Sequence, residues 1–282
     1  MRIVSLVPSA TDILAALGLG NAIVGVGRHS GVPPGAERVE VLTAQDGDSA
    51  RLDGERLIAL APDLVFAGGD TFVGGDANGG PASRGAIRRA VARMPRRPAI
   101  YALAPKTVGD ALSDVKTVAD ATGTQVRAHE LLIQLRRRID RVTLRTAGVT
   151  HVPRVACLER LDPPRTAGRW VPELIGMAGG HDVLAGSGEP SLQTWDEFAA
   201  LAPEVLVLLD RLPTATGVAC APPEVASAPG WRALPAVRAG RVFLVDATLL
   251  TRAGPRLVDG LETLAGLLHP SLFEDFAPSS TM

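Results

Sequence analysis

The chain has 282 residues, 46% hydrophobic and 21% charged, so it is long enough for two domains or one large α/β domain and too apolar to be mostly disordered. Its 29 lysines and arginines nearly balance its 30 aspartates and glutamates, which argues against a general nucleic-acid binder or a protein that binds anionic membranes. Two cysteines, Cys157 and Cys220, without a Cys-x-x-Cys motif exclude a disulfide framework and a zinc knuckle.

The first half of the chain starts with a strand and a helix. Residues 2–7 form an apolar run typical of a strand, and the helical spacing that follows is expected to begin at Ser9 as its N-cap. A later helix is expected to be capped by Asp53 and to stop before Pro62, whose ring cannot continue it. An apolar strand follows directly after that proline.

The second half repeats this order of elements. A strand is expected over residues 154–159 and a helix over residues 171–178. Thr194 and Glu197 have the spacing of a capping box, and their helix stops before Pro203, about half a chain length after the first such proline. The repeat predicts an α/β fold of two similar Rossmann-like lobes with mainly parallel sheets.

Two helices are expected between the halves. The first covers residues 106–121, and the second runs from residue 124 to about 146 without Pro or Gly, about 34 Å of helix. The second helix therefore predicts a long connection that limits hinge motion. Its polar face is rich in arginine, which favours a solvated surface over a face for an anionic partner. The predicted domains are an N-terminal lobe (1–105), connecting helices (106–147) and a C-terminal lobe (148–282).

No catalytic motif is present, and the five histidines are scattered, so the chain is not predicted to be an enzyme. The glycine-rich segment of residues 68–85 has no phosphate-binding spacing, and it follows a strand end, where ligands bind in parallel sheets. Trp170 offers either a flat stacking face for a ligand or a core contact at a helix start. Trp195 and Trp231 are expected to be structural.

A family resemblance is carried by Arg2-Ile-Val-Ser-Leu-Val-Pro-Ser-Ala-Thr-Asp-Ile-Leu, the Ala-Leu-Ala-Pro-Asp-Leu-Val repeat, Gly-Arg-Trp-Val-Pro-Glu-Leu, Pro-Gly-Trp-Arg-Ala-Leu-Pro and Gly254-Pro-Arg-Leu-Val-Asp-Gly-Leu-Glu. Together they resemble the cobalamin-binding branch of the helical-backbone periplasmic binding proteins, from Arg2 to Pro270. The resemblance implies two α/β lobes joined by a long helix, with a cleft for a corrinoid, siderophore or haem-sized ligand. It also implies delivery of that ligand to an ABC transporter.

The expected ligand-binding residues lie at the carboxyl ends of strands and in the Trp170 and Gly-rich loops: Pro8, Ser9, His29, Ser30, Gly69, Asp70, Phe72, Arg169, Trp170, Glu189, Pro190 and Arg252. No metal site is predicted, and His29 is the one residue that could coordinate a metal centre. The resemblance implies one exposed docking acid on each lobe for the transporter. Asp196 or Glu197 matches the second lobe, and Asp70 or Asp76 is the expected choice in the first.

We therefore expect a non-enzymatic, monomeric binding protein whose corrinoid is cargo and not a cofactor, with no nucleic-acid partner and no membrane span. The loop from His29 to Pro34 lacks the acids, Cys and Tyr of the family. This departure favours an alternative, a cytoplasmic sequestering or resistance protein for another natural product. The apolar run at residues 3–7 is too short for a signal peptide, so a cytoplasmic protein is expected, or a periplasmic or extracellular one if the start was trimmed.

Overall fold

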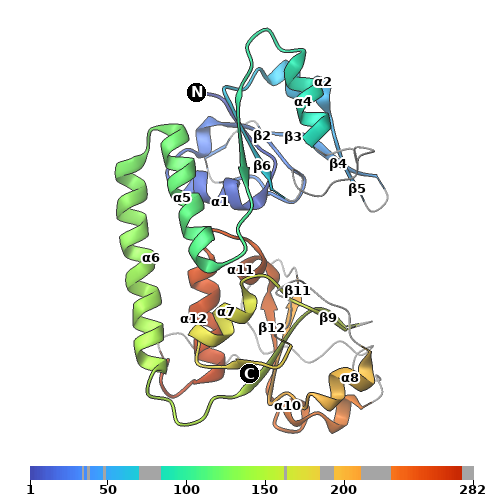
Figure 1. The fold of residues 1–282 in the computed structure, drawn as a ribbon, viewed down its shortest axis with the longest axis vertical. Coiled ribbons are helices and arrows are strands. Elements are labelled where there is room, and N and C mark those ends of the chain that lie inside the picture. The colour runs from blue at the N-terminus through green and yellow to red at the C-terminus, as the bar shows by residue number, and fades with distance from the viewer. Residues whose placement is uncertain are drawn as a thin grey trace. The chain divides into compact units, whose positions relative to one another are not determined.

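The computed structural model describes residues 1–33, 35–36, 39–46, 49–69, 84–161, 164–184, 194–210 and 230–274 (Figure 1). The chain divides into two compact units. Unit 1 comprises residues 1–105, 109–133 and 253–255, and unit 2 comprises residues 106–108, 134–252 and 256–282. The connecting segment predicted as a separate part is thus shared between the units.

Unit 1 is built on a parallel sheet in the order β3-β2-β1-β6-β7. Its strands are β1 (Ile3–Ser5), β2 (Ile23–Val26), β3 (Glu40–Val41), β6 (Leu64–Gly68) and β7 (Ala99–Leu103). A separate antiparallel hairpin, which the sequence did not predict, joins β4 (Thr43–Asp46) and β5 (Ser49–Leu52). The helices of this part are α1 (Pro8–Ala16), η1 (Gly20–Ala22), α2 (Gly54–Leu60), α4 (Arg84–Ala92) and α5 (Val108–Thr122).

Both faces of the unit 1 sheet are covered. Ile3 and Phe66 point into a core cluster with buried residues of α1 and α5. Their strand neighbours Val4 and Val65 point to the opposite face, into a cluster with α2 and α4. This alternation follows from the two-residue period of a strand, and it explains why the strands are apolar on both sides.

Unit 2 carries a second parallel sheet in the order β10-β8-β11-β12, with β9 antiparallel to β8. Its strands are β8 (Arg154–Leu161), β9 (Pro164–Thr166), β10 (His181–Asp182), β11 (Val205–Asp210) and β12 (Val242–Asp246). Its helices are α7 (Val171–Met177), α8 (Trp195–Ala200), η2 (Trp231–Ala233), α10 (Pro235–Arg238), α11 (Ala247–Thr251) and α12 (Leu257–Leu268). Trp231 is buried, as expected of a structural residue.

The internal repeat is visible in the caps of α2 and α8. Asp53 accepts a hydrogen bond from the Arg56 backbone N–H, and Thr194 forms the complete capping box that its spacing predicts. After each helix an alanine takes the left-handed conformation, Ala61 at φ 41° and Ala202 at φ 45°. Each alanine precedes the proline that ends its helix, so the same local sequence produces the same turn in both units.

The long helix α6 (Gln125–Thr146) is continuous, as predicted (green in Figure 1). Part of its arginine-rich face is used inside unit 2. Arg138 donates to Asp259 at 2.6 Å and also to Glu262, which accepts a further bond from Arg141 at 2.9 Å. Both acids lie on α12, so Arg138 and Arg141 fasten one helix to another, which differs from the solvated surface that the sequence favoured.

The start of α1 differs from the prediction. The helix begins at Pro8, and its N-cap is Val7, which makes no side-chain capping hydrogen bond. Ser9 is therefore the second residue of the helix and not its cap. Proline is favoured at the first helical position because its missing N–H would have no partner there and its φ angle is already helical.

A carboxyl group on α5 is placed unfavourably for its charge. Burial, and then repulsion from Asp110 one turn earlier, raise the pKa of Asp114 to about 6. Its Oδ2 atom is buried and has no hydrogen-bond partner among the described residues. Because the pKa is raised on folding, the protonated form stabilises the fold, and this stabilisation is lost as pH rises from about 4 to about 6.

We expect Asp114→Asn to stabilise the protein near pH 7 and to change little near pH 3.5. The expected gain is about 1 kcal/mol, less than the shift alone would give because water screens this partly exposed side chain. Urea unfolding at both pH values measures the change in the free energy of unfolding. Asp120→Asn, exposed on the same helix, is the control; an equal effect of both changes would contradict the explanation.

Within the parts of the chain that the structure describes, every helix is too short or too polar to span a bilayer.

Candidate functional site

Three loops follow the carboxyl ends of adjacent strands in unit 1. Pro8 and Ser9 come after β1, His29 and Ser30 after β2, and Gly69 after β6, and these strands are parallel neighbours. The predicted residues of the first half therefore emerge at one edge of the sheet, where ligands bind in open parallel sheets. Two other predicted residues of this half, Asp70 and Phe72, lie outside the described residues, as does Asp76.

Two glycines allow these loops to approach one another. A Cβ atom on Gly27 would lie 2.5 Å from the Leu6 backbone oxygen. A Cβ atom on Gly69 would lie 2.0 Å from the Ala104 Cβ, and the Gly69 N–H donates to the Leu103 carbonyl at 2.6 Å. Only glycine fits at either position, so the loops after β2 and β6 are held against their neighbours.

The same edge carries polar groups. Ser5 and Thr11 are buried, and their hydroxyl groups share a hydrogen bond of 2.7 Å. Ser30 is 3% exposed, and its hydroxyl has no partner among the described residues. His29 is exposed. The hydroxyl groups of Ser5, Thr11 and Ser30 are thus buried, and this edge of unit 1 offers the His29 imidazole and the N-terminal amides of α1, which favour oxygen acceptors of a ligand.

In unit 2, the segment before α7 contains a strained arginine. Arg169 has φ 61°, in the left-handed region that costs a residue with a Cβ about 1–2 kcal/mol. Its side chain is exposed, and its guanidinium carbon lies 6.0 Å from the centre of the Trp170 ring. Backbone strain is often kept at binding sites, so this conformation marks Arg169 as a candidate ligand contact.

Trp170 itself belongs to the core of unit 2. Only 3% of its surface is exposed, and its indole N–H donates to the Leu250 carbonyl at 2.7 Å. The stacking face expected from the sequence is therefore covered, and the structure favours the alternative, a tryptophan that packs at the start of α7. Its place among the ligand-binding residues is corrected accordingly.

The remaining predicted residues of unit 2 fall into two groups. Arg252 is partly buried at the end of α11, while Glu189 and Pro190 lie outside the described residues.

Burial raises the pKa of two groups in the unit 2 sheet. It raises the pKa of Asp182, and it raises the pKa of the Cys157 thiol well above its usual value. A thiol that stays protonated is unreactive, which agrees with the inert buried cysteine expected from the sequence.

The acids at the start of α8 have different roles. Glu197 accepts hydrogen bonds from both the backbone N–H and the hydroxyl of Thr194, which hold the pKa of Glu197 below its usual value. Asp196 is exposed, and the described residues include no partner for it. Of the two predicted docking acids, Asp196 is thus the one that remains available for a partner.

The internal repeat identifies a docking candidate that the sequence analysis missed. Glu55 is the second residue of α2, as Asp196 is of α8, and it lies at the corresponding distance before its proline. Its side chain is 72% exposed and pairs with Arg93, whose side chain is also exposed. The signal was present in the repeat itself, because alignment of Pro62 with Pro203 pairs these two acids.

No cluster of three or more histidine, cysteine or carboxylate side chains that could hold a metal ion occurs among the described residues. His29 therefore stays a single candidate contact for a metal centre that a ligand brings with it.

Comparisons with known proteins give one consistent family. A profile described as periplasmic binding protein matches residues 3–249. A Bacillus subtilis protein named as an uncharacterised ABC transporter substrate-binding lipoprotein is 27% identical over 97% of this chain and 82% of its own. A vitamin B12-binding protein of Yersinia pestis is 26% identical over 73% of this chain and 69% of its own.

Among solved structures, the periplasmic haem-binding protein RhuT of Roseiflexus in apo form is 29% identical, with a TM-score of 0.74 over 96% of this chain and 98% of its own. This likeness confirms the predicted α/β fold with mainly parallel sheets. The family consists of solute-binding proteins and not enzymes, which confirms the predicted class of function.

The comparisons contradict the expected cytoplasmic location. The relatives are named as a lipoprotein and as a periplasmic protein, which points to a place outside the cytoplasm. The expectation rested on the short apolar run before Pro8, and the location of the relatives overrides it. The sequestering alternative, which rested on the altered His29–Pro34 loop and on the expected cytoplasmic location, is not favoured by the comparisons.

Proposed function

Because this chain belongs to the periplasmic binding protein family, we propose that it binds a corrinoid or haem outside the cytoplasm and presents it to an ABC transporter. The observation that carries the proposal is the likeness along nearly the whole chain to a haem-binding protein, together with the vitamin B12-binding relative. Both ligands are metal-containing macrocycles with oxygen acceptors on their side chains, carboxylates in haem and amides in corrinoids.

The proposed contacts lie at the carboxyl edge of each sheet. In unit 1 they are the first turn of α1 with Pro8 and Ser9, and the His29–Ser30 loop. In unit 2 they are Arg169 and Arg252. Guanidinium groups, hydroxyls and helix N-terminal amides all donate hydrogen bonds, so they suit the acceptor oxygens around either macrocycle. His29 is proposed as the residue nearest to the metal centre of the ligand.

A titration with cyanocobalamin and with haemin, followed by native mass spectrometry, tests this proposal. We expect a complex with at least one of the two ligands, and a shift of the ligand absorption bands that is lost in His29→Ala.

Arg169→Gly relieves the backbone strain but removes the guanidinium, and we expect it to weaken ligand binding about tenfold or more. Absence of binding to both ligands, with a ferric siderophore bound instead, would contradict the proposal.

We further propose that Glu55 and Asp196 are the acids that meet the transporter. They occupy equivalent positions of the repeat, both are exposed, and neither is used in a helix cap. Charge pairs at the rim of an interface guide association and orient the partners. One acid in each unit gives two such pairs with the transporter in total.

Charge reversal at these acids is expected to weaken transporter binding without changing ligand affinity. Glu55→Lys and Asp196→Lys should each reduce the affinity for the cognate transporter in detergent by about tenfold or more, because like charges then face each other. Glu197→Gln is the matched control, since it removes a charge next to Asp196 but keeps an acceptor for the capping box. An equal loss in all three variants would show that net charge, and not these positions, governs docking.

A further inference from the structure

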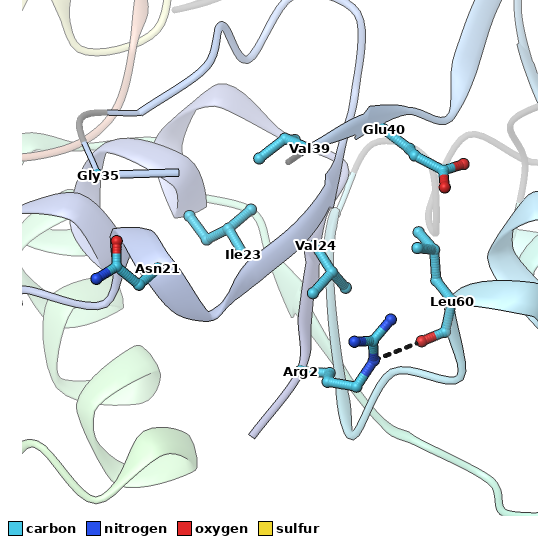
Figure 2. A pocket seen from close by; sticks show the side chains of 8 residues that line it. All are labelled: Arg2, Asn21, Ile23, Val24, Gly35, Val39, Glu40 and Leu60. Carbon is cyan, nitrogen blue, oxygen red and sulfur yellow. Dashed lines mark hydrogen bonds between the residues drawn. The ribbon is translucent and has the colours of Figure 1, made fainter. Parts of the chain in front are cut away.

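Unit 1 has a cavity of about 760 Å³ at the edge of the sheet opposite to the proposed ligand contacts (Figure 2). Arg2 precedes β1, Asn21 lies just before β2, and Val39 precedes β3, so the lining comes from the amino ends of three adjacent strands. In parallel strands the amino and carboxyl ends are at opposite edges of the sheet. The cavity is therefore a different place from the proposed macrocycle site.

The floor of this cavity is apolar. Val24 and Leu60 belong to the cluster on the α2 and α4 face of the sheet and contribute hydrocarbon surface there, whereas Ile23 and Val39 belong to the cluster on the other face. Figure 2 shows Val24 near the centre of the group. A volume of this size is within the range of about 300–1,000 Å³ that is typical of small-molecule sites. An apolar body of a ligand would be removed from water here.

Arg2 presents an oriented guanidinium at one side of the floor. Its Nε–H donates to the Leu60 carbonyl at 2.8 Å (Figure 2). Its backbone N–H donates to Asp63 at 2.8 Å. The terminal nitrogens of the guanidinium have no partner among the described residues. Because the bond to Leu60 orients the guanidinium plane, its remaining donors are arranged to bind a carboxylate.

Glu40 supplies the opposite charge on the edge strand β3. Its side chain is exposed and lines the same cavity, and the described part of the chain contains no partner for its carboxylate. Asn21 adds an amide, whose oxygen lies against Gly35, where an added Cβ atom would be only 2.7 Å from it. One cation and one anion thus border a common apolar floor, and the two do not form an ion pair with each other.

We propose that this cavity is a second binding site, for a small zwitterion with an apolar body, such as an apolar amino acid or a short apolar peptide. The carboxylate of the ligand binds the terminal nitrogens of Arg2, and its ammonium group binds Glu40. The apolar side chains rest on Val24 and Leu60. The site is independent of macrocycle binding, since it lies at the other edge of the sheet.

Titration of the ¹⁵N-labelled protein with the dipeptide leucyl-leucine tests the proposal. We expect saturable shifts of the Val24 and Glu40 amide signals. Arg2→Gln keeps a donor for the Leu60 carbonyl but lacks the guanidinium, and we expect it to weaken dipeptide binding about tenfold or more. We expect a loss of the same size in Glu40→Gln. The N-acetylated dipeptide should bind more weakly to the wild type and should be insensitive to Glu40→Gln.

Val24→Phe fills the floor without changing charge, and it should also abolish the shifts. Thermal unfolding shows whether each variant is folded, and cyanocobalamin or haemin affinity should be the same in all of them. Lack of saturation by leucyl-leucine at millimolar concentration would overturn the proposal, as would equal affinities of wild type and folded Arg2→Gln. Neither result would bear on the macrocycle site, because that affinity is measured separately.

Discussion

Trp170→Ala is expected to destabilise the protein by about 3–5 kcal/mol, because it removes a fully packed aromatic side chain and leaves a cavity in unit 2. The indole N–H also donates to the Leu250 carbonyl at 2.7 Å, so the substitution leaves a buried acceptor without a partner. Chemical denaturation measures the change in the free energy of unfolding.

Trp170→Phe separates packing from hydrogen bonding. It keeps most of the apolar volume and loses the donor, so we expect a cost of about 1–3 kcal/mol. Ligand affinity of the folded Phe variant should stay within about threefold of the wild type, because the ring is covered by its own unit. A large loss of affinity with unchanged stability would return Trp170 to the ligand-binding residues.

Gly27→Ala is expected to destabilise unit 1 and to impair ligand binding together. The new Cβ atom would lie 2.5 Å from the Leu6 oxygen, and a backbone atom cannot move aside as a flexible side chain can. The strain should cost about 1–3 kcal/mol and should displace the adjacent His29–Ser30 loop. Thermal unfolding and ligand titration measure the two effects.

Gly176→Ala is the matched control in α7. A Cβ atom there meets nothing within 4 Å, and alanine favours a helix over glycine by about 0.5–1 kcal/mol. The same chemical change should therefore stabilise at position 176 and destabilise at position 27. If both variants behaved alike, the close contact with Leu6 would not be the cause.

Local patterns predicted the parts of the fold that local interactions determine. The proline-terminated helices of both halves were predicted from their caps and from Pro62 and Pro203, and the structure confirms them. The left-handed conformation of Ala61 and Ala202 was not predicted. The long helix α6 was predicted because residues 124–146, a run of 23, contain neither Pro nor Gly. The carboxyl-edge position of the His29 loop followed from the parallel order of strands alone.

Contacts between distant residues explain what the sequence did not reveal. The partner of Trp170 is a carbonyl 80 residues later, so its burial could not be read from neighbouring residues. The strands β4 and β5 are only four residues long, and their alternation of polar and apolar residues is too short to distinguish them from a loop. The cavity beside Arg2 arises from the starts of three strands, which only the sheet order β3-β2-β1 brings together.

Hydrogen exchange with and without the bound macrocycle tests the central claim most directly. We predict slower exchange of backbone amides at both carboxyl edges, around Ser9 and Ser30 in unit 1 and around Arg169 in unit 2. Amides at the amino edge, around Asn21 to Val24, should exchange at the same rate in both states. Protection confined to one unit, or protection at the amino edge alone, would contradict the account.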